Sequence, residues 1–501
     1  MASAYKHGAY GELDASAVSA AASASAIPLL VGTAPVNLIR GYADLVNKPI
    51  RLADIGAKKE IGYSEDYKAF TLCEVVDAFF DNDKGNVGPI YIINVLNPDT
   101  HRKNRQTTTS VTFTNGKGYI KSDRIIIDSL AIADKAEGTD YTLSYNFNTG
   151  KLLIDSSKAA TPLDGAVSVT YYEVNPAAVT DDDIIGAVSE DGEYTGLQVG
   201  SLMYPQLNVI VNLIAAPGWS EHKAVYQAME EFAQRINQHW YAFVLADIPL
   251  SDDSGEGTVL IDTIAKAKEW KTKNEYGSMY DKIWWPQSKT ASSRIFHLST
   301  LAAVEALRAD TENDGVPMQS ISNISVPVAA QYFGEGSKNQ GFDNIEANSL
   351  NEAGISTLTT WGGERRLWGP HTGAFAAGAD GNAVPDLDPL GIFDVNIRMQ
   401  EYVLNAFQEK WGNSVDKGMT IALRDQILED EQQKLDALVA VGAFIGSPKI
   451  VFLESENSRT DIMNGNFVFN FSTTPTPPAK SLTAKIAYTD AGFSAYFESE
   501  D

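Results

Sequence analysis

The chain of 501 residues has one cysteine, Cys73, so it can form neither an internal disulfide nor a cysteine-based zinc site. Cys73 falls within the apolar pattern of residues 70–80, which favours a buried thiol over a reactive one. No run of 18 apolar residues occurs, so no transmembrane helix is predicted. The amino-terminal residues lack the basic and hydrophobic regions of a secretory signal. We therefore expect a protein of a reducing cytoplasm, without membrane insertion.

Basic residues are scarce. The chain has 39 Lys and Arg against 65 Asp and Glu, which gives a net charge of −26. A phosphate backbone requires clustered Lys and Arg, so nucleic-acid binding is not expected. A charge of this size keeps free subunits soluble and makes any self-assembly sensitive to salt. The hydrophobic content of 44% is that of a folded protein, and the length predicts two to four domains.

Motifs that bind nucleotides, metals or catalytic water are missing. The glycine-rich segments 115–122 and 334–340 lack the spacing of a phosphate loop. Segment 81–85 resembles the start of a calcium loop, but Ile92 stands where a bidentate Glu is required. The six histidines form no HExxH motif, and no GxSxG elbow is present. The three aspartates 181–183 are typical of an exposed helix start. No cofactor, metal site or enzymatic activity is predicted.

One acidic residue leaves an enzymatic alternative open. Asp247 follows the apolar strand-like segment 242–245, at the carboxyl end of a predicted parallel strand. Enzymes of the α/β class place catalytic acids at this end of the sheet. The structural alternative is an aspartate that caps the turn before Pro249.

Strands and helices alternate in two parts of the chain. Segments 27–31 and 90–96 are predicted as strands on either side of a helix over 66–80. The pattern resumes with a strand over 208–215 and a helix that Ser220 can cap. Further strands at 242–245 and 283–285 flank a helix around 259–271. Strands that alternate with helices of this length predict a mostly parallel sheet covered on both faces.

Between these two parts, residues 99–175 have the pattern of a small all-β domain. Short strands are predicted at 111–114, 124–127, 141–147, 151–154 and 167–172. The strand over 141–147 alternates aromatic or apolar with polar residues, and 148–150 (NTG) supplies a hairpin turn. We expect this segment to be inserted into the α/β domain, with its two seams close together.

The carboxyl-terminal part begins with two amphipathic helices. Apolar residues recur at three- and four-residue steps in both, and Gly446 is expected to end the second helix. The first stripe is Met399, Tyr402, Val403, Ala406, Phe407 and Trp411, and the second is Leu423, Ile427, Leu435, Leu438, Val439 and Gly442. Strand-like runs follow at 449–453, 466–472 and 481–489, and the proline-rich segment 473–478 separates the last two.

Both ends of the chain are predicted to act outside their own fold. In segment 493–498, Phe493, Ala495 and Phe497 alternate with polar neighbours and Tyr496, directly after Gly492. Such a terminal strand is suited to adding to another sheet. Residues 1–26 have three charges and little apolar surface, so they cannot fold alone. These ends predict a polymer.

Taken together, the order of these segments resembles one family. The segments are YKHGAYGELDAS (5–16), AIPLLVGTAP (26–35), DYTLSYNFNTGKLLI (140–154), NLIAAPGWS (212–220), WGGERRLWGPHTG (361–373), Asn396-Ile397-Arg398, KIVFLESEN (449–457) and MNGNFVFNFSTTPTPPAKSL (463–482). In this order they resemble the contractile tail sheath proteins of phages and related injection machines. Residues 297–300 (HLST) depart from the Pro-Pro-Ser-Gly of many members, which leaves the turn there open.

The resemblance implies a multidomain α/β and α+β fold and a structural function. It implies subunits that stack as hexameric rings into a helical sheath around a tail tube, and a contraction that drives the tube through the target cell envelope without nucleotide hydrolysis. Expected partners are further copies, the tube protein, and baseplate and tail terminator proteins. The expected location is the tail of a virion assembled in the host bacterial cytoplasm. The domains implied are an amino arm (1–26), an α/β core (27–98 and 176–379), an inserted β domain (99–175), an α+β domain (380–491) and a carboxyl arm (492–501).

The resemblance also implies strand exchange between subunits. The expected donors are Tyr5, His7, Tyr10, Phe493, Ala495, Tyr496 and Phe497, and the expected acceptor sheet contains Ile450, Phe452, Phe467, Phe469 and Phe471. Two other functions stay open, an α/β enzyme with a substrate-binding insert and a non-contractile shell or adhesin. Only the sheath predicts helical tubes of uniform diameter.

Overall fold

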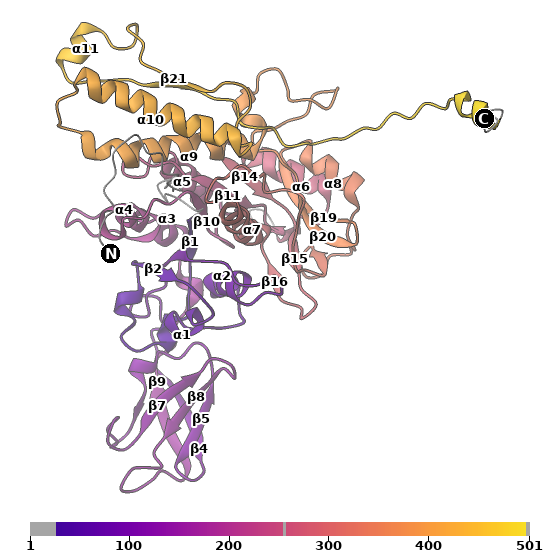
Figure 1. Cartoon of the computed structure of the whole chain (residues 1–501). Helices are drawn as coiled ribbons and strands as arrows, with labels where there is room; N and C mark the ends of the chain where they lie inside the picture. Colours follow the sequence, from indigo (N-terminus) through magenta and orange to yellow (C-terminus); the bar gives the residue numbers. More distant parts are fainter. Residues whose placement is uncertain (1–26, 254–256, 497–501) are drawn as a thin grey trace, which may run out of the picture.

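The computed structural model describes residues 27–253 and 257–496, and its centre is a nine-stranded sheet (Figure 1). Six inner strands run parallel, and β2, β20 and β17 are added antiparallel at the edges, which confirms the predicted mostly parallel sheet. In sheet order the strands are β17 (Ile324–Ser325), β20 (Glu364–Trp368), β19 (Ile355–Trp361), β14 (Asp281–Trp284), β11 (Phe243–Asp247), β10 (Leu213–Ala215), β1 (Pro28–Gly32), β3 (Ile90–Asn94) and β2 (Pro49–Leu52).

Helices connect successive parallel strands and cover the sheet, as the alternating pattern predicted. They are α2 (Thr71–Phe80), α5 (Lys223–Ala233), α6 (Ile264–Lys273), α7 (Leu298–Glu312) and α8 (Asn344–Asn351). Smaller elements are α1 (Ala57–Glu60), α3 (Asp181–Ile185), α4 (Met203–Leu207), and the short sheets of β12 (Ser251–Asp252) with β13 (Val259–Leu260) and of β16 (Ile295–Phe296), β15 (Gln287–Lys289) and β18 (Ala330–Tyr332).

The start of α5 corrects a prediction. Ser220 does not cap this helix, because its side chain is buried and its Oγ accepts a hydrogen bond from the backbone of Asp247 (3.1 Å). The helix begins instead after His222. It ends at Ala233, and the chain turns shortly afterwards at Asn237 and Gln238, which both adopt positive φ.

Residues 99–175 form two three-stranded antiparallel sheets with their own apolar core, at the end of the molecule opposite α10 (Figure 1). Segment 124–127 is not a strand but leads into a 3₁₀ turn, whereas the glycine-rich segment 115–122 supplies an unpredicted strand, because Asn115 and Gly116 form a hairpin turn with positive φ. The sheets are β4 (Thr107–Phe113), β9 (Gly165–Tyr171) and β6 (Ala131–Ile132), and β5 (Lys117–Lys121), β8 (Lys151–Asp155) and β7 (Thr142–Asn146).

The β segment meets the α/β unit where its two connections run side by side. Arg102 and Val174 are antiparallel bridge partners, and the backbone N–H of Asn175 donates to the carbonyl of His101 (2.8 Å). Val174 packs in the core of the α/β unit, while Leu38 from the α/β unit packs in the core of the β segment. Each unit therefore places apolar side chains in the other.

A third apolar core lies in the carboxyl-terminal part. The two predicted helices are α9 (Asp394–Trp411) and α10 (Ile421–Ala440), which pack with β21 (Lys449–Val451), β22 (Asn470–Ser472) and the short α11 (Arg459–Met463) above the sheet (Figure 1). Gly442, with φ +84°, follows the end of α10. It is therefore not part of the helical stripe in which it was predicted, and the prediction that Gly446 ends the helix is wrong by one turn.

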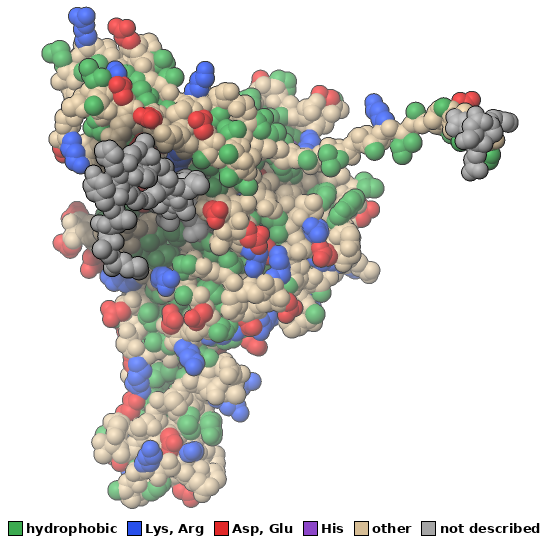
Figure 2. Space-filling model, in the orientation of Figure 1, with side chains coloured by type: hydrophobic (Ala, Val, Ile, Leu, Met, Phe, Trp, Pro, Cys, Tyr) green, Lys and Arg blue, Asp and Glu red, His purple; other side chains and the backbone are tan. Residues whose placement is uncertain are grey.

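The chain after residue 480 leaves the body as an exposed run (Figure 1). The strand predicted over 481–489 is not present, and Ala491–Tyr496 form a 3₁₀ turn where an extended strand was predicted. Apolar side chains are visible along this run in Figure 2, and Leu482, Ile486 and Tyr488 are more than four-fifths exposed. Without a neighbouring strand this segment has no partner for its backbone groups, so its alternation alone does not make a strand.

Candidate functional site

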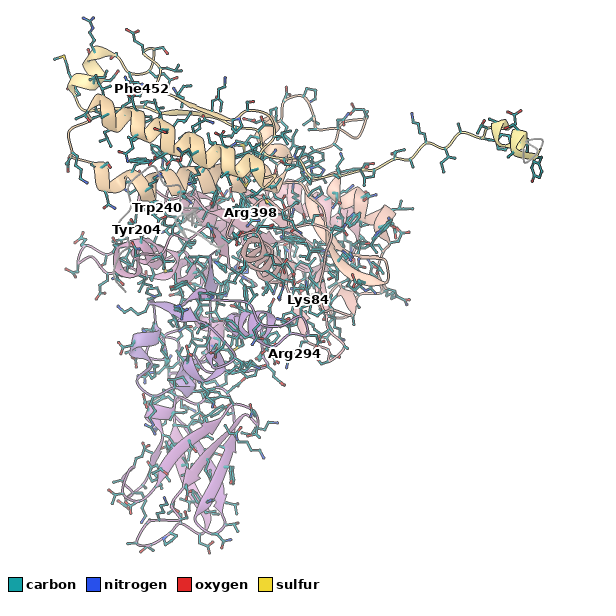
Figure 3. The ribbon with its side chains drawn as sticks, viewed as in Figure 1. Lys84, Tyr204, Trp240, Arg294, Arg398 and Phe452 are labelled. Carbon is teal, nitrogen blue, oxygen red and sulfur yellow. The ribbon has the colours of Figure 1, made fainter. Side chains whose placement is uncertain are left out.

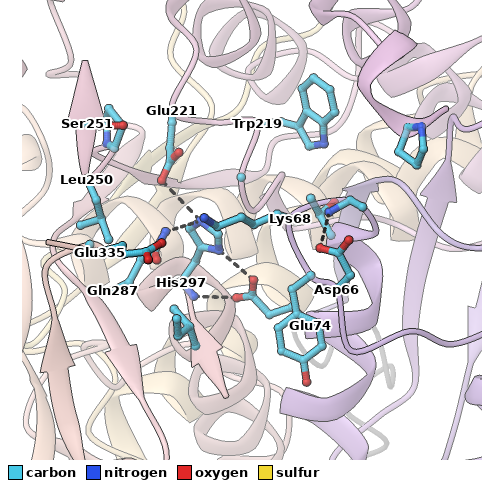
Figure 4. A pocket seen from close by; sticks show the side chains of 18 of the residues that line it. Asp66, Lys68, Glu74, Trp219, Glu221, Leu250, Ser251, Gln287, His297 and Glu335 are labelled. Carbon is cyan, nitrogen blue, oxygen red and sulfur yellow. Dashed lines mark hydrogen bonds and ion pairs between the residues drawn. The ribbon is translucent and has the colours of Figure 1, made fainter. Parts of the chain in front are cut away.

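A crevice of about 1720 Å³ opens at the carboxyl edge of the parallel strands. The chain passes from β1 to β3 on one side and to β10 on the other, and ligands of α/β proteins bind at such a switch point. The crevice is lined by Thr71 at the start of α2, Trp219 after β10, Leu250 after β11 and His297 before α7 (Figure 4). By position, this is where an enzyme of this class would hold its substrate.

His297, in the segment that departs from the family pattern, sits between two glutamates in this crevice (Figure 4). Its Nδ1 lies 2.8 Å from Glu74 Oε2, and its Nε2 lies 3.4 Å from Glu221 Oε1. The amide of Gln287 is 2.8 Å from the same Nε2. Burial alone would lower the pKa of His297, but the carboxylates of Glu74 and Glu221 raise it well above 6.5. A charged imidazole thus joins α2, the loop before α5 and the start of α7.

Asp247 lies at the carboxyl end of β11, as predicted, but it caps α7 rather than its own turn. Its carboxylate accepts hydrogen bonds from the backbone N–H (3.1 Å) and the hydroxyl of Ser299. The side chain is buried, and this burial raises its pKa to about 6. Asp247 therefore has the surroundings of a helix cap.

Carboxylates of the protein itself occupy the anion-binding end of α7. The backbone N–H of His297 donates to Glu74 (2.6 Å), and that of Ser299 donates to Asp247. A phosphate or substrate carboxylate would need these same donors. Internal carboxylates thus occupy the N–H donors at which an anionic ligand in this crevice would be bound.

The other sites tested from the sequence have structural explanations. Asn82 accepts a hydrogen bond from the backbone of Lys84 (2.9 Å), so segment 81–85 is a turn. Thr180 and Asp183 form a capping box at the start of α3, as the aspartate run predicted. Cys73 is buried, as predicted. Across residues 27–253 and 257–496, no group of His, Cys, Asp and Glu has a metal-binding arrangement, and no helix is long and apolar enough to cross a bilayer.

The predicted acceptor residues come together beside α9. Strands β21 and β22 pair antiparallel, with Ile450 opposite Phe471. The ring of Phe407 lies 5.5 Å from that of Phe471 and 6.0 Å from that of Phe469, and Phe452 lies 5.3 Å from Phe469. These aromatic residues form one half-buried layer between the two-stranded sheet and α9.

The strand predicted over 466–472 is present only at Asn470–Ser472. Asn457 explains the difference, because its side chain bonds both backbone groups of Val468, accepting from the N–H (2.8 Å) and donating to the carbonyl (3.0 Å). These bonds hold the backbone as a loop, so Phe467 lies outside the strand and is half-buried. The two-stranded sheet is consequently short.

The predicted donors are not joined to this sheet within one chain. Phe493, Ala495 and Tyr496 lie in the exposed 3₁₀ turn at the far end of the carboxyl-terminal run. Tyr5, His7, Tyr10 and Phe497 lie outside the described residues. Donation of these strands stays a prediction.

Sequence reasoning missed a row of buried polar residues on α9. Asp394, Arg398, Glu401 and Asn405 follow one another at four- and three-residue steps, opposite the apolar stripe. Lys282 Nζ lies 2.6 Å from Asp394 Oδ2, and neither side chain is exposed. Arg398, on the side of α9 that faces the sheet (Figure 3), forms an ion pair with Asp310. The spacing is the one signal that could have revealed this row.

Comparison with known proteins agrees with the resemblance found in the sequence. No protein-family model matches the chain. The chain is 26% identical over 479 residues to the tail sheath protein of Burkholderia phage BcepMu, which covers 92% of this chain and 91% of that one. Over nearly its whole length, the chain is similar to a contractile tail sheath protein. Its resemblance to the family is thereby confirmed.

Solved sheath structures share the fold at low sequence identity. A sheath of the PVC extracellular contractile injection system, in its contracted state, superposes with a TM-score of 0.56, 12% identity and coverage of 98% and 99% of the two chains. A chain of the sixfold-symmetrised baseplate of the anti-feeding prophage gives 0.53, 15% identity and coverage of 97% and 100%. The protein is thus a tail sheath subunit, of a structural and non-enzymatic family. The internal ion pairs in the crevice agree with this function.

Proposed function

We propose that this sheath subunit polymerises as hexameric rings stacked helically around a tail tube, and that its two ends link the rings by donating strands. The observation that carries the proposal is that one chain contains both an unpaired terminal segment and a small sheet with free edges. One is the exposed run after residue 480, with Leu482 and Ile486 open to solvent. The other is the short β21–β22 sheet, whose outer edges belong to three-residue strands.

The energies favour a linkage that works only in a polymer. An added strand makes several backbone hydrogen bonds of about 0.5–1.5 kcal/mol each, and burial of Phe493 adds about 1.5–3 kcal/mol. Ordering the arm costs about 1–2 kcal/mol per residue for the backbone alone. A single arm is therefore marginal, whereas many arms that close a ring make the later contacts intramolecular and stable.

The proposal extends to partners and to motion. We assign the 1–26 and 492–501 segments to arms, 99–175 to an inserted domain and 380–491 to a sheath domain that carries the acceptor sheet. Baseplate association is supported by the likeness to a chain of the anti-feeding prophage baseplate. Tube and terminator proteins would complete a virion tail assembled in the host cytoplasm. Contraction then drives the tube through the cell envelope by a change in packing, without catalysis.

Truncation of the arms tests the proposal. We expect the purified full chain to form tubes of uniform diameter in electron micrographs, and deletion of residues 492–501 or 1–20 to leave a folded monomer with near-native circular dichroism. Tyr496→Pro should act in the same way if that residue's N–H joins a ladder. Truncated protein that still sediments as long tubes would show that the arms are not the linkage.

Absence of catalysis is tested at Asp247. Asp247→Asn keeps an acceptor for the N–H of Ser299. Burial raises the pKa of the parent carboxyl to about 6, so the fold does not favour its charged form and loss of the charge should cost little. Assembly is therefore expected to be unchanged. An enzymatic turnover that this substitution abolishes would contradict the structural function.

A further inference from the structure

An acidic hairpin, residues 188–194, follows α3 directly on one side of the molecule. Together, α3 and the hairpin (residues 181–193) include six carboxylates and no Lys or Arg. Val188 and Tyr194 are bridge partners, and the N–H of Ser189 donates to the carbonyl of Glu193 (2.8 Å), so the tip is a formed hairpin. Within the described chain, the carboxylates of Asp182, Glu190, Asp191 and Glu193 take part in no ion pair. Val188 is 51% exposed at the base of this negative tip.

A tryptophan patch lies on another face, where β19 and β20 form a hairpin over α8. Trp361 is 52% exposed, and its ring stacks on that of Trp368 with centroids 6.1 Å apart. Trp368 Nε1 donates to Asn348 Oδ1 on α8 (3.1 Å), and Ile345, one helical turn before Asn348, is 72% exposed. The patch is formed by Ile345, Trp361 and Trp368, which lie on the three elements α8, β19 and β20.

Two cations border the tryptophan patch without a carboxylate partner among the described residues. Lys268 Nζ on α6 donates to Ser349 Oγ of α8 (2.7 Å). Arg365 on β20 donates to Thr360 Oγ1 (2.6 Å) and to the carbonyl of Ala329 (3.0 Å). Both side chains are held in place by neutral acceptors, so their positive charges stay available to a negative surface. Exposed tryptophan bordered by arginine is the composition of an interface centre.

The two surfaces lie on opposite sides of the body, with α3 at one side of the sheet and β19–β20 at the other (Figure 1). We propose that the tryptophan patch of one sheath subunit binds the acidic hairpin of the next copy. Contact between two different surfaces repeats head to tail, which gives a ring when it closes and a helix when it does not. This interface is additional to the arms and rests on the proposed polymer.

Charge favours a second copy as the occupant of the patch. Two chains of −26 repel each other over most of their surfaces, so a contact between them is favoured where cations of one chain face carboxylates of the other. Lys268 and Arg365 opposite Glu190 and Asp191 provide this pairing, and Trp361 and Val188 provide apolar area at its centre. The arms link subunits flexibly, whereas this contact would fix how the bodies are oriented.

Charge reversal on each surface tests the pairing in the full-length chain. One variant carries Lys268→Glu and Arg365→Glu, and the other carries Glu190→Lys and Asp191→Lys. Each alone is expected to raise the lowest protein concentration that gives sedimenting tubes by about tenfold or more, because each interface then opposes like charges. An equimolar mixture is expected to restore the wild-type threshold, since every contact in an alternating polymer is again between opposite charges.

Trp361→Ser tests the apolar centre, with Tyr119→Ser as its matched control. Tyr119 is exposed to a similar extent, 56%, but lies on β5 at the far end of the β segment. Trp361→Ser is expected to raise the assembly threshold about tenfold with an unchanged thermal unfolding midpoint, and Tyr119→Ser to change neither. If Trp361→Ser lowers the unfolding midpoint, the mixture of the two charge-reversed variants alone tests the interface.

The outcomes separate this interface from the polymer itself. Wild-type tubes together with unchanged thresholds in the two charge-reversed variants, or a mixture that assembles no better than its components, would overturn the interface and leave the sheath polymer standing. A wild-type chain that forms no tube under any salt condition would overturn both.

Discussion

The β segment and helix α9 are both attached to the α/β unit, but by opposite kinds of contact. The β segment is held by exchanged apolar side chains such as Leu38 and Val174, and its ion pairs to the α/β unit lie near the surface, such as that of Arg40, which lies 3.0 Å from Asp128 with 46% of its side chain exposed. Helix α9 is held by the pairs Lys282–Asp394 and Arg398–Asp310, whose side chains are buried. The ion pairs of the first joint are in contact with solvent, and those of the second are sealed from it.

This difference decides what each joint contributes. An exposed ion pair is screened by water and salt and contributes little to stability. A buried pair gains little net energy against a hydrophobic alternative, but loss of one partner leaves a charge without solvent. Loss of one partner should therefore cost more stability at the ion pairs of α9 than at the exposed ion pairs of the β segment. Residues 99–175 also differ from the rest of the chain in charge. They have nine basic and nine acidic residues, so they contribute nothing to the net charge of −26.

Removal of one buried partner is expected to give the largest effect. Asp394→Ala should lower the free energy of unfolding by about 3–5 kcal/mol, because it leaves the ammonium of Lys282 buried and unpaired. Chemical denaturation followed by tryptophan fluorescence measures this change. The control is Lys282→Met combined with Asp394→Asn, which removes both charges and keeps an acceptor for the N–H of Ile321. This double variant should lie within about 1 kcal/mol of wild type. An equal loss in both variants would mean that the charges are not the cause.

The pH dependence of stability is expected to follow Glu401 on the same face of α9. Burial raises the pKa of Glu401 from 4.5 to about 8, although Arg398 opposes this shift. The folded state then holds a proton that the unfolded state releases, so the free energy of unfolding falls as pH rises from about 4.5 to about 8, at roughly 1.4 kcal/mol per pH unit from this group. Glu401→Gln removes this contribution. Denaturation at pH 5 and pH 8 should show a smaller difference in the variant, and equal differences would contradict the assignment.

Deletion of the β segment is expected to have a smaller effect on stability. A two-residue Asn-Gly turn can replace residues 103–173, because Arg102 and Val174 are already bridge partners. The loss of Ile126, which packs in the α/β core, should cost about 1.5–3 kcal/mol. Leu38→Thr in the same protein removes the apolar surface that the deletion exposes. Soluble protein that still forms tubes is the expected result, and insoluble product with both changes would show that the β segment belongs to the main core.

Loss of an exposed pair at the same joint is expected to have the least effect. Arg40→Ala should change the free energy of unfolding by no more than about 1 kcal/mol, and the difference should shrink further in 1 M salt. The comparison with Asp394→Ala, by the same denaturation experiment, then measures the contrast between the two joints. Losses of similar size in both variants would mean that the exposed and the buried ion pairs contribute equally to stability.

The parts of the fold that were predictable are those that repeat a local period. Alternating strands and helices in the α/β unit, the hairpin at 148–150 and the apolar stripe from Met399 to Trp411 all follow from neighbours within a few residues. The polar row on α9 does not. Its partners lie 112 residues away at Lys282 and 88 residues away at Asp310, and a pattern that equates burial with apolar side chains assigns such a row to solvent.

The candidate site was predictable in its residues but not in its connections. Asp247 was placed at the correct end of its strand, yet Ser299, which it caps, lies 52 residues further along the chain. The reverse holds for the predicted strand after Gly492, where the sequence alternates but no strand pairs with it among the described residues. A strand needs both an alternating sequence and a neighbouring strand to pair with. Alternation alone therefore predicted more structure at the end of the chain than is present.

The exposed run near the carboxyl terminus has a mechanical consequence. Lys480 is its last anchor on the body, where the ammonium donates to the carbonyl of Gly381 (3.0 Å). The nine residues 481–489 that follow are exposed and belong to no helix or strand. At about 3.3 Å per residue they span about 30 Å when taut and much less when slack. If the end of this segment is bound to a second subunit, as proposed, that subunit can move by up to tens of ångströms before the segment is fully extended. The two subunits then stay linked while their relative position changes.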